Sequence, residues 1–492
     1  MPAEVKDARP ANSTPFAPHS AFDGWVAEML RNEATHYSEG EGDRIVNLIW
    51  ICSDTFRNDH LGCMGNKRVK TPGLDRLAAE GALFENAHAE GLPTGPERLV
   101  HFTGKFTLPF RGWSPLKDDE ITLPEHLRKL GFRTALMADT YHMFKPNNSY
   151  HRGFSEWRWI RGQEGDAYVS ANKGEDPWKY FSQRSKEIPT ERKHSGGKDF
   201  IRPLKQYLQN VADRGGDESK YFPAQTIGES MRWLEDNRDA EKFLLWIEMF
   251  DPHEPFDPPK RFYDMYADPH YKGTHYLSPW HHSLSAADFT KEEMDDVRAL
   301  YAGEVSMVDY WVGKLVDKVD ALGLRDETII LFTSDHGTLL GEHGGVTKTP
   351  SLQNTLSQWI ANVPLIVSNP RGPKGMRVKD MVWSPDFMPT CCEMLGIEKP
   401  ETAHGRGFWK TTQGDSSAAR EYTITGWGKK YQYVVDLEWR FMANGGIVPD
   451  QLFHRADDPL EERDVAPRHP DVCAKMRKRL EKFWEDAKSL RP

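Results

Sequence analysis

Residues 45–55 read IVNLIWICSDT, a nearly continuous apolar run that ends in Ser-Asp-Thr. Consecutive apolar residues bounded by polar ones are typical of a strand that is buried on both faces of a parallel sheet. Ligands in such sheets bind beyond the carboxyl ends of the strands. The run therefore predicts both the class of fold and a functional position for Asp54, directly after the strand.

The same pattern recurs along the chain. Three more buried strands are predicted, each preceded by a predicted helix; the strands are 134–138, 243–249 and 328–333, and the helices are 123–131, 226–236 and 293–322. Further helices are expected at 71–81 and, near the N-terminus, at 21–37. Helices that alternate with buried strands indicate an α/β fold with a large, mostly parallel central sheet flanked by helices.

The pattern also predicts how the chain is divided. We expect an N-terminal extension over 1–44, a catalytic α/β domain over 45–415 and a small C-terminal subdomain over 416–492. The C-terminal part is rich in short aromatic and β-branched segments, which favour an antiparallel sheet, and it ends in a predicted helix at 470–487. Residues 147–220 show little periodicity, and we interpret them as an irregular insertion near the site.

Composition limits the possible partners. The 492 residues are 38% hydrophobic and 11% aromatic, which is enough for a sizeable core, and the net charge is −10. Such a charge argues against general binding to nucleic acid or to a membrane surface. No apolar run is long enough to span a membrane, and the N-terminus has no apolar signal segment. The five cysteines lack a framework spacing and suit reduced thiols, so we expect a cytoplasmic protein.

Polar side chains follow four of the predicted strands and should therefore meet in one site. They are Asp54, His142, His253 and the pair Asp335-His336. Two carboxylates and an imidazole, from Asp54, Asp335 and His336, suit a divalent metal such as Mn²⁺, Zn²⁺ or Ca²⁺. Taken singly, Asp54 is equally well a helix cap and Asp335-His336 a turn before glycine.

Two further side chains suit acid–base work. His253 and Lys348 could bind an oxyanion and protonate a leaving group, although a single histidine or lysine in a loop is more often only solvated. His343 is a weaker candidate for contact with a leaving group.

Residues 94–104 read TGPERLVHFTG, in the frame Xaa-x-Pro-x-Arg-x-x-x-x-Thr-Gly. This frame resembles the core motif of the sulfatases, where the first position is a Cys or Ser that is converted to formylglycine. Other matching segments are 47–54, 251–256, 333–337 and 457–462. From about Asn47 onward the chain thus resembles the sulfatase branch of the alkaline phosphatase superfamily.

The resemblance implies a role for each matching residue. Asp54, Asp335 and His336 would hold the metal, and Thr94 would contact both metal and substrate. Arg98 would orient the nucleophile. The groups expected to contact the substrate are Thr140, His142, His253, Lys348 and, less directly, His343. Lys348 follows Asp335 at the spacing of the phosphonate monoester hydrolases of this branch.

Three positions depart from the usual sulfatase pattern. Thr55 replaces the second aspartate of an Asp-Asp pair, and Thr140 replaces the lysine of Lys-Trp-His. Thr94 replaces the formylglycine precursor and cannot become an aldehyde. The missing lysine favours a substrate whose transferred group carries one negative charge rather than two.

Thr94 also decides how a covalent intermediate could be released. A formylglycine hydrate expels sulfate with its second hydroxyl, which threonine lacks. Water must instead attack the central atom of the threonine ester, a step well precedented at phosphorus. We therefore predict a metal-dependent hydrolase of phosphodiesters or phosphonate monoesters that works through a phospho-threonine intermediate, with one divalent ion and no formylglycine.

Two alternatives stay open. The first is a sulfate ester hydrolase that works without formylglycine. The second is a catalytically retired sulfatase-like protein that binds an anion, although drift should have eroded the set of polar residues described above. The expected partner of the enzyme is a small anionic ester substrate, with no nucleic acid and no membrane. The resemblance also implies a homo-oligomer, either a dimer or a tetramer.

Overall fold

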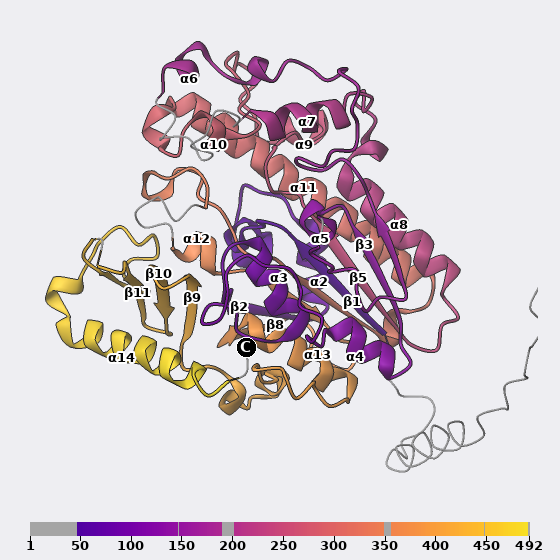
Figure 1. Cartoon of the computed structure of the whole chain (residues 1–492), viewed down its shortest axis with the longest axis vertical. Helices are drawn as coiled ribbons and strands as arrows, with labels where there is room; N and C mark the ends of the chain where they lie inside the picture. The colour runs from indigo at the N-terminus through magenta and orange to yellow at the C-terminus, as the bar shows by residue number, and fades with distance from the viewer. Residues whose placement is uncertain (1–46, 146, 189–200, 349–355, 447, 491–492) are drawn as a thin grey trace, which may run out of the picture. The chain divides into compact units, whose positions relative to one another are not determined.

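The computed structural model describes residues 47–145, 147–188, 201–348, 356–446 and 448–490 (Figure 1). The helix predicted near the N-terminus lies outside these residues.

A sheet of eight strands forms the centre of the described chain, in the order β4-β3-β5-β1-β6-β7-β2-β8. The strands are β1 (Asn47–Ser53), β2 (Ala82–His88), β3 (Arg133–Ala138), β4 (Glu156–Trp159), β5 (Phe243–Met249), β6 (Thr328–Thr333), β7 (Leu365–Ser368) and β8 (Met376–Trp383). Only β7 runs against its neighbours, β6 and β2. The prediction of a mostly parallel sheet is therefore confirmed.

Helices cover both faces of this sheet. The helices of the large sheet and its insertion are α2 (Pro72–Ala79), α3 (Thr94–Thr103), α4 (Leu123–Lys129), α5 (Tyr141–Phe144), α6 (Gln183–Glu187), α7 (Arg202–Asn210), α8 (Phe222–Asp236), α9 (Lys260–Tyr263), α10 (Pro279–His282), α11 (Lys291–Ala321), α12 (Gln358–Ala361) and α13 (Phe387–Leu395). The long α11 begins with a capping box, in which Thr290 and Glu293 satisfy each other's backbone N–H groups.

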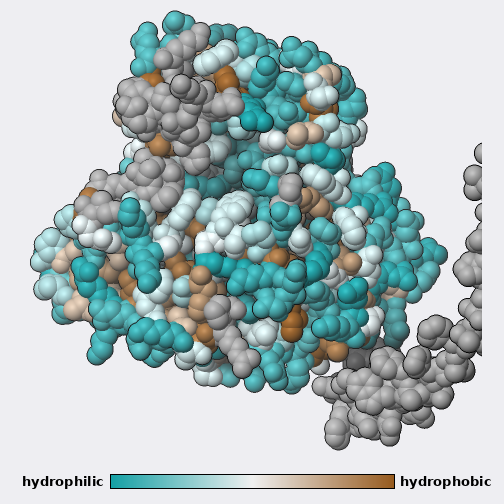
Figure 2. Space-filling view, viewed as in Figure 1, coloured by the Kyte–Doolittle hydropathy of each residue, from teal (hydrophilic) through white to brown (hydrophobic). Residues whose placement is uncertain are grey.

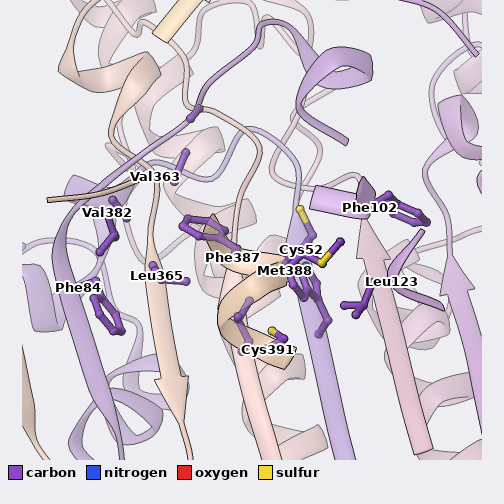
Figure 3. Packing of buried hydrophobic residues seen from close by; sticks show 14 of the residues in the cluster. Cys52, Phe84, Phe102, Leu123, Val363, Leu365, Val382, Phe387, Met388 and Cys391 are labelled. Carbon is purple, nitrogen blue, oxygen red and sulfur yellow. The ribbon is translucent and has the colours of Figure 1, made fainter. Parts of the chain in front are cut away.

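The core is divided by the sheet into two clusters. Leu48, Trp50 and Cys52 of β1 point to the side of α3, α4 and α13, and Figure 3 shows Cys52 there beside residues of α13. Ile49 and Ile51 point to the other side, where α2, α8 and α11 pack. All of these β1 side chains are fully buried. Burial on both faces explains the unbroken apolar run, and it fixes the strand ends that carry the site.

The insertion is more regular than predicted. The sequence shows little periodicity over 147–220, but β4 pairs with β3 at the sheet edge, and α7 packs its apolar face into a small separate core. The prediction of an irregular segment is therefore wrong for these elements. The strand was missed because β4 reads EWRW and is mostly half-exposed, so it lacks the apolar run of a buried strand.

A second sheet follows the first along the chain. Its four antiparallel strands have the order β12-β11-β10-β9; they are β9 (Thr423–Trp427), β10 (Tyr431–Val435), β11 (Trp439–Ala443) and β12 (Gln451–His454). One face packs against Met476 and Phe483 of α14 (Pro470–Ala487), and Tyr433 on the other face joins the main core. The predicted antiparallel sheet with a terminal helix is confirmed.

The surface is largely hydrophilic on the face shown in Figure 2, with apolar residues scattered over it. Among the described residues, none of the helices is long and apolar enough to cross a membrane.

Candidate active site

The site lies beyond the carboxyl ends of four neighbouring strands. The order β3-β5-β1-β6 places the ends of these strands side by side. The segments that follow them carry Thr140 and His142, His253, Asp54, and Asp335 with His336. The sheet therefore brings together groups that are far apart in the sequence, as the positions of the polar residues after the strands predict.

Asp54, Asp335 and His336 form the candidate metal centre. One ligand atom from each lies within 4.8 Å of the others, and all three side chains are fully buried. The His336 Nδ1 lies 3.1 Å from the Gly337 carbonyl oxygen. Because a carbonyl can only accept, Nδ1 carries the proton, and the Nε2 lone pair faces the Asp335 carboxylate at 3.3 Å.

The charges of this group fit a cation. Burial raises the pKa of Asp54, and the neighbouring Asp335 carboxylate raises it further. Two buried carboxylates that repel each other, beside an imidazole lone pair, match the donors of a divalent metal site. A cation between them would remove the repulsion, so the residues present fit a divalent ion.

Thr94 stands beside this centre, at the first residue of α3. Its Oγ1 lies 3.2 Å from the His336 Nε2. Unpaired backbone N–H groups at a helix N-terminus attract anions, so the start of α3 suits an anionic group bound at Thr94. Position 95 requires glycine for a steric reason, because a Cβ there would lie 2.8 Å from the ring of Trp113.

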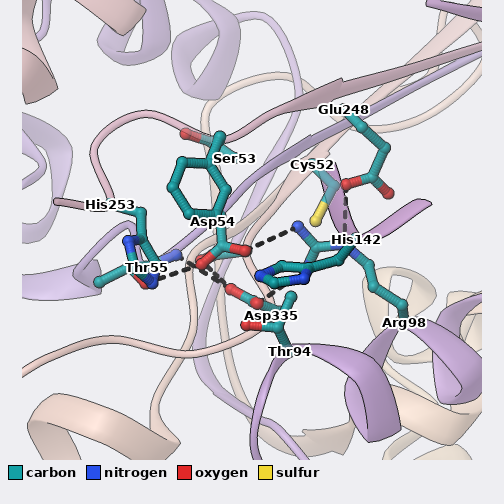
Figure 4. A network of polar contacts seen from close by, with 12 residues as sticks. Cys52, Ser53, Asp54, Thr55, Thr94, Arg98, His142, Glu248, His253 and Asp335 are labelled. Atoms are coloured by element: carbon teal, nitrogen blue, oxygen red, sulfur yellow. Dashed lines mark hydrogen bonds and ion pairs between the residues drawn. The ribbon is translucent and has the colours of Figure 1, made fainter. Parts of the chain in front are cut away.

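Arg98 lies one helical turn after Thr94, at the centre of a group of buried charged side chains (Figure 4). Its guanidinium contacts three carboxylates: Glu248 at 2.8 Å, Asp335 at 2.9 Å and Asp54 at 3.4 Å. Burial alone would raise the pKa of Asp335, but the Arg98 charge holds it well below its usual range. Arg98 thus contacts both carboxylates of the candidate metal centre, and its described ion pairs do not include Thr94.

Glu248 was not predicted from the sequence as a residue of the site. It is fully buried on β5, and burial raises its pKa to about 7 against the opposing charge of Arg98. The available signal was a charged residue inside the apolar strand FLLWIEM, since carboxylates are almost never fully buried without a partner.

Thr55 links Lys348 to the metal centre. The Lys348 Nζ donates to the Thr55 Oγ1 at 2.7 Å, and the Thr55 hydroxyl donates to Asp54 at 2.7 Å. Thr55 has a φ of +63°, a left-handed conformation that costs a β-branched residue about 1–3 kcal/mol. The Tyr301 hydroxyl donates to the Thr55 carbonyl at 2.8 Å and helps to hold it. A hydroxyl bridge thus replaces the second aspartate.

Two histidines form the outer part of the site. The His253 Nδ1 donates to the Glu254 carbonyl at 2.8 Å, and Phe250 stacks on the His253 ring at 4.2 Å. The His142 Nε2 lies 3.0 Å from a carboxylate oxygen of Glu164, a residue the sequence reasoning also missed.

The remaining predicted residues have different surroundings. The Thr140 hydroxyl is buried, and no protein partner is found for it among the described residues. The described contacts of His343 are with Glu461, at 3.6 Å, and with the ring of Trp359. Glu461 also binds Tyr433 of the small sheet. His343 therefore contacts the C-terminal part of the chain, and its predicted contact with substrate stays a prediction.

Comparison with known proteins agrees with this geometry. The sulfatase family model matches residues 46–397. An arylsulfatase of Clostridium perfringens is 25% identical over 447 residues, which cover 84% of this chain and 89% of that protein. The multifunctional alkaline phosphatase superfamily protein PehA of Trinickia caryophylli is 27% identical over 405 residues, which cover 74% of this chain and 76% of PehA.

A solved structure shows the same fold. The phosphonate monoester hydrolase of Agrobacterium radiobacter superposes with a TM-score of 0.67 at 22% identity, covering 90% of this chain and 96% of the other. The family model spans well over half of the chain, and the buried group of Asp54, Asp335 and His336, which could hold a metal ion, lies beyond the carboxyl ends of the strands. The chain therefore belongs to the sulfatase family and is a hydrolase of ester bonds.

Proposed function

We propose that this chain is a metal-dependent hydrolase of phosphodiesters or phosphonate monoesters, with Thr94 as nucleophile and a phospho-threonine intermediate. The observation that carries the proposal is the Thr94 hydroxyl, 3.2 Å from His336 and at the first residue of α3. The side chain at this position has the hydroxyl that a nucleophile needs but not the second one that formylglycine chemistry needs.

The proposed reaction has two displacements at phosphorus. The Thr94 hydroxyl releases its proton to solvent and its oxygen attacks phosphorus, the bond from phosphorus to the leaving oxygen breaks, and His253 or Lys348 supplies the proton that the leaving oxygen takes up. Water then attacks the same phosphorus and gives up a proton, and the Thr94 oxygen departs and takes up a proton, which restores the hydroxyl. A divalent ion held by Asp54, Asp335 and His336 would lower the pKa of the Thr94 hydroxyl and offset negative charge on the transferred group.

The charges around the nucleophile support a transferred group with a single negative charge. Thr140 offers a hydroxyl where many family members have a lysine. Arg98 is already shared among three carboxylates, and Lys348 is bound through Thr55 to Asp54. A phosphodiester or phosphonate monoester carries one such charge, whereas a phosphate monoester carries two near neutral pH.

A second candidate is a sulfate ester hydrolase that works without formylglycine. The arylsulfatase similarity favours it, and a sulfate ester also carries one negative charge. The third candidate, a retired anion-binding protein, is opposed by the buried group of Asp54, Asp335 and His336, which suits a divalent ion, and by the buried Arg98 that contacts both of its carboxylates.

A substrate panel separates the three. The metal-loaded enzyme should hydrolyse an aryl phosphodiester and an aryl phosphonate monoester faster than the matching aryl sulfate. Thr94→Ser should keep measurable turnover, and Thr94→Ala should lose at least about a thousandfold, as expected for a covalent nucleophile. Faster turnover of the sulfate would favour the second candidate, and no turnover of any ester the third. Unchanged activity in Thr94→Ala would rule out the proposed nucleophile.

A further inference from the structure

An acidic side chain faces the outer histidine of the site. A carboxylate oxygen of Glu164 lies 3.0 Å from the His142 Nε2, with side chains 24% and 17% exposed respectively. Glu164 comes from the insertion, and no motif of the sequence points to it.

Hydrogen bonds and an ion pair hold the loop that carries Glu164 in place. Asp166 accepts from the Arg161 guanidinium at 2.6 and 2.7 Å and from the Gly162 backbone at 2.9 Å. Gln163 donates to Asp251, which lies on the loop of His253. Glu164 itself has a left-handed backbone conformation, with a φ of +52°. Its carboxylate is therefore held against His142 by structure on both sides.

Glu164 is negatively charged at working pH. Burial alone would raise its pKa, but the charges of His142, and then of His253 and Lys145, hold it at about 2. The pair lies close to the nucleophile, because the Trp113 ring meets His142 edge-on at 4.8 Å and covers Gly95, the neighbour of Thr94. The Phe250 ring lies 6.0 Å from the His142 ring and stacks on His253.

We infer that Glu164 is a specificity-determining residue, which occupies His142 and makes the site select transferred groups with one negative charge over dianionic ones. The inference rests on the proposed function in one respect, namely that His142 faces the transferred group.

The charges of the whole site lead to this conclusion. Arg98, Lys348, His253 and His142 each have a carboxylate within 4.0 Å. Arg98 meets three carboxylates, Lys348 lies 3.9 Å from Asp54, and His253 lies 3.5 Å from the Glu254 carboxylate. Glu164 completes the set at His142. Apart from the bound metal ion, a second negative charge on the substrate would therefore meet only cationic side chains that already have a carboxylate partner, and it would lie near the Glu164 carboxylate.

The test replaces the charge and keeps the shape. Glu164→Gln keeps the length of the side chain, and Glu164→Asn suits the left-handed backbone, so the two variants guard against a folding artefact. Glu229→Gln is the matched control, because Glu229 is also 24% exposed and ion-paired, to Arg158 at 2.5 Å. Its described ion pairs do not include a group of the site.

The readout is a ratio of rates on one protein. Nitrophenyl phosphate and nitrophenyl sulfate have the same shape and leaving group, but the transferred group is a dianion in the first and a monoanion in the second. Both Glu164 variants should raise the ratio of kcat/KM for the phosphate to that for the sulfate by about tenfold or more, and Glu229→Gln should leave it unchanged. A smaller rise, or an equal rise in the control, would overturn the inference.

A binding measurement gives the same comparison without turnover. At a pH where phenylphosphonate is a dianion, calorimetry should show that it binds more tightly to Glu164→Gln than to the parent. Binding of methylphenylphosphinate, a monoanion of similar shape that has no ester bond, should change little. Equal changes for both ligands would overturn the inference. The proposed function is tested by a different comparison: it would fail if the parent enzyme hydrolysed the sulfate faster than a phosphodiester. The effect of Glu164 is measured instead from the ratio of phosphate to sulfate hydrolysis, so the two failures can be told apart.

Discussion

Two buried clusters in this protein have the same composition and different connections. The Arg98 cluster joins Arg98 to Asp54, Glu248 and Asp335, and the Arg214 cluster joins Arg214 to Asp251, Asp257 and Glu304. Each has one arginine and three carboxylates, and all six carboxylates are buried or nearly so.

The two clusters differ in how many of the carboxylates the arginine contacts. Arg98 contacts all three of its carboxylates, and Asp335 keeps its charge. Arg214 contacts Asp257 at 2.6 Å, whereas Asp251 and Glu304 hydrogen-bond to each other. Burial raises the pKa of Asp251 to about 7 and that of Glu304 well above its usual range.

The comparison shows how the same side chains serve two purposes. In the Arg98 cluster, a central arginine contacts all three carboxylates and keeps Asp335 charged next to the lone pair of His336, which is an arrangement for a cation. In the Arg214 cluster, a shared proton joins the loop of His253 to α11 and, through Gln163, to the insertion. The first is suited to chemistry, and the second holds parts of the site in place.

Removing the arginines should give the largest difference. Arg98→Met leaves three buried carboxylates without their cation, so we expect a loss of at least about a thousandfold in kcat/KM and about 3–5 kcal/mol in the free energy of unfolding. Arg214→Met should lower stability but keep most of the activity in the folded protein. Urea unfolding and steady-state kinetics measure both; an active Arg98→Met would contradict the assignment.

The two clusters should also differ in metal binding. Asp335→Asn should weaken binding of the divalent ion by at least about 100-fold, since even changes in groups that only support metal ligands cost 10–100-fold. It should also remove the rise in Tm that added metal gives the parent. Asp257→Asn is the control from the Arg214 cluster. Elemental analysis measures the bound metal, and thermal melts measure the rise in Tm with added metal. Equal metal loss in the two variants would contradict the assigned ligands.

Stability should depend on pH through the Arg214 cluster. Because the pKa of Asp251 is raised to about 7 in the folded state, the folded protein keeps a proton that the unfolded chain loses near its ordinary pKa. The stabilisation is therefore present at low pH and lost as the pH rises from about 4 to about 7, by up to about 4 kcal/mol.

Glu304→Gln provides the check on this dependence. Glutamine can donate to an ionised Asp251 and needs no shared proton, so the curve of stability against pH should be flatter than that of the parent. Urea unfolding at a series of pH values gives both curves. Parallel curves would show that the pair does not share a proton.

The smallest effect is expected at Thr55. Thr55→Val keeps the shape and removes the hydroxyl that joins Lys348 to Asp54. We expect about a tenfold lower kcat/KM and a loss of about 1 kcal/mol in stability. An unchanged rate would mean that Lys348 acts without this bridge.

The strands that carry the site could be predicted from the sequence because both of their faces are buried. β1, β3, β5 and β6 each read as an apolar run, and the polar residue after each run marks the site. β4 is half-exposed at the sheet edge, and β7 is short, so neither has that signal.

The site was only partly predictable for a related reason. Asp54, Asp335 and His336 follow strands, and Thr94 and Arg98 lie in a recognisable frame. Glu248 and Glu164 matter through their contacts with Arg98 and His142, and no motif or spacing links the two members of either pair in the sequence. Such pairs depend on the completed fold, which periodicity and spacing do not describe.

The covalent role of Thr94 is tested most directly by the stereochemistry at phosphorus. A single diastereomer of a chiral aryl phosphorothioate diester would be hydrolysed in heavy-oxygen water, and the configuration of the product determined by phosphorus NMR. Two in-line displacements, first by Thr94 and then by water, predict net retention of configuration. Inversion would mean that water attacks the substrate directly, and it would contradict the phospho-threonine intermediate.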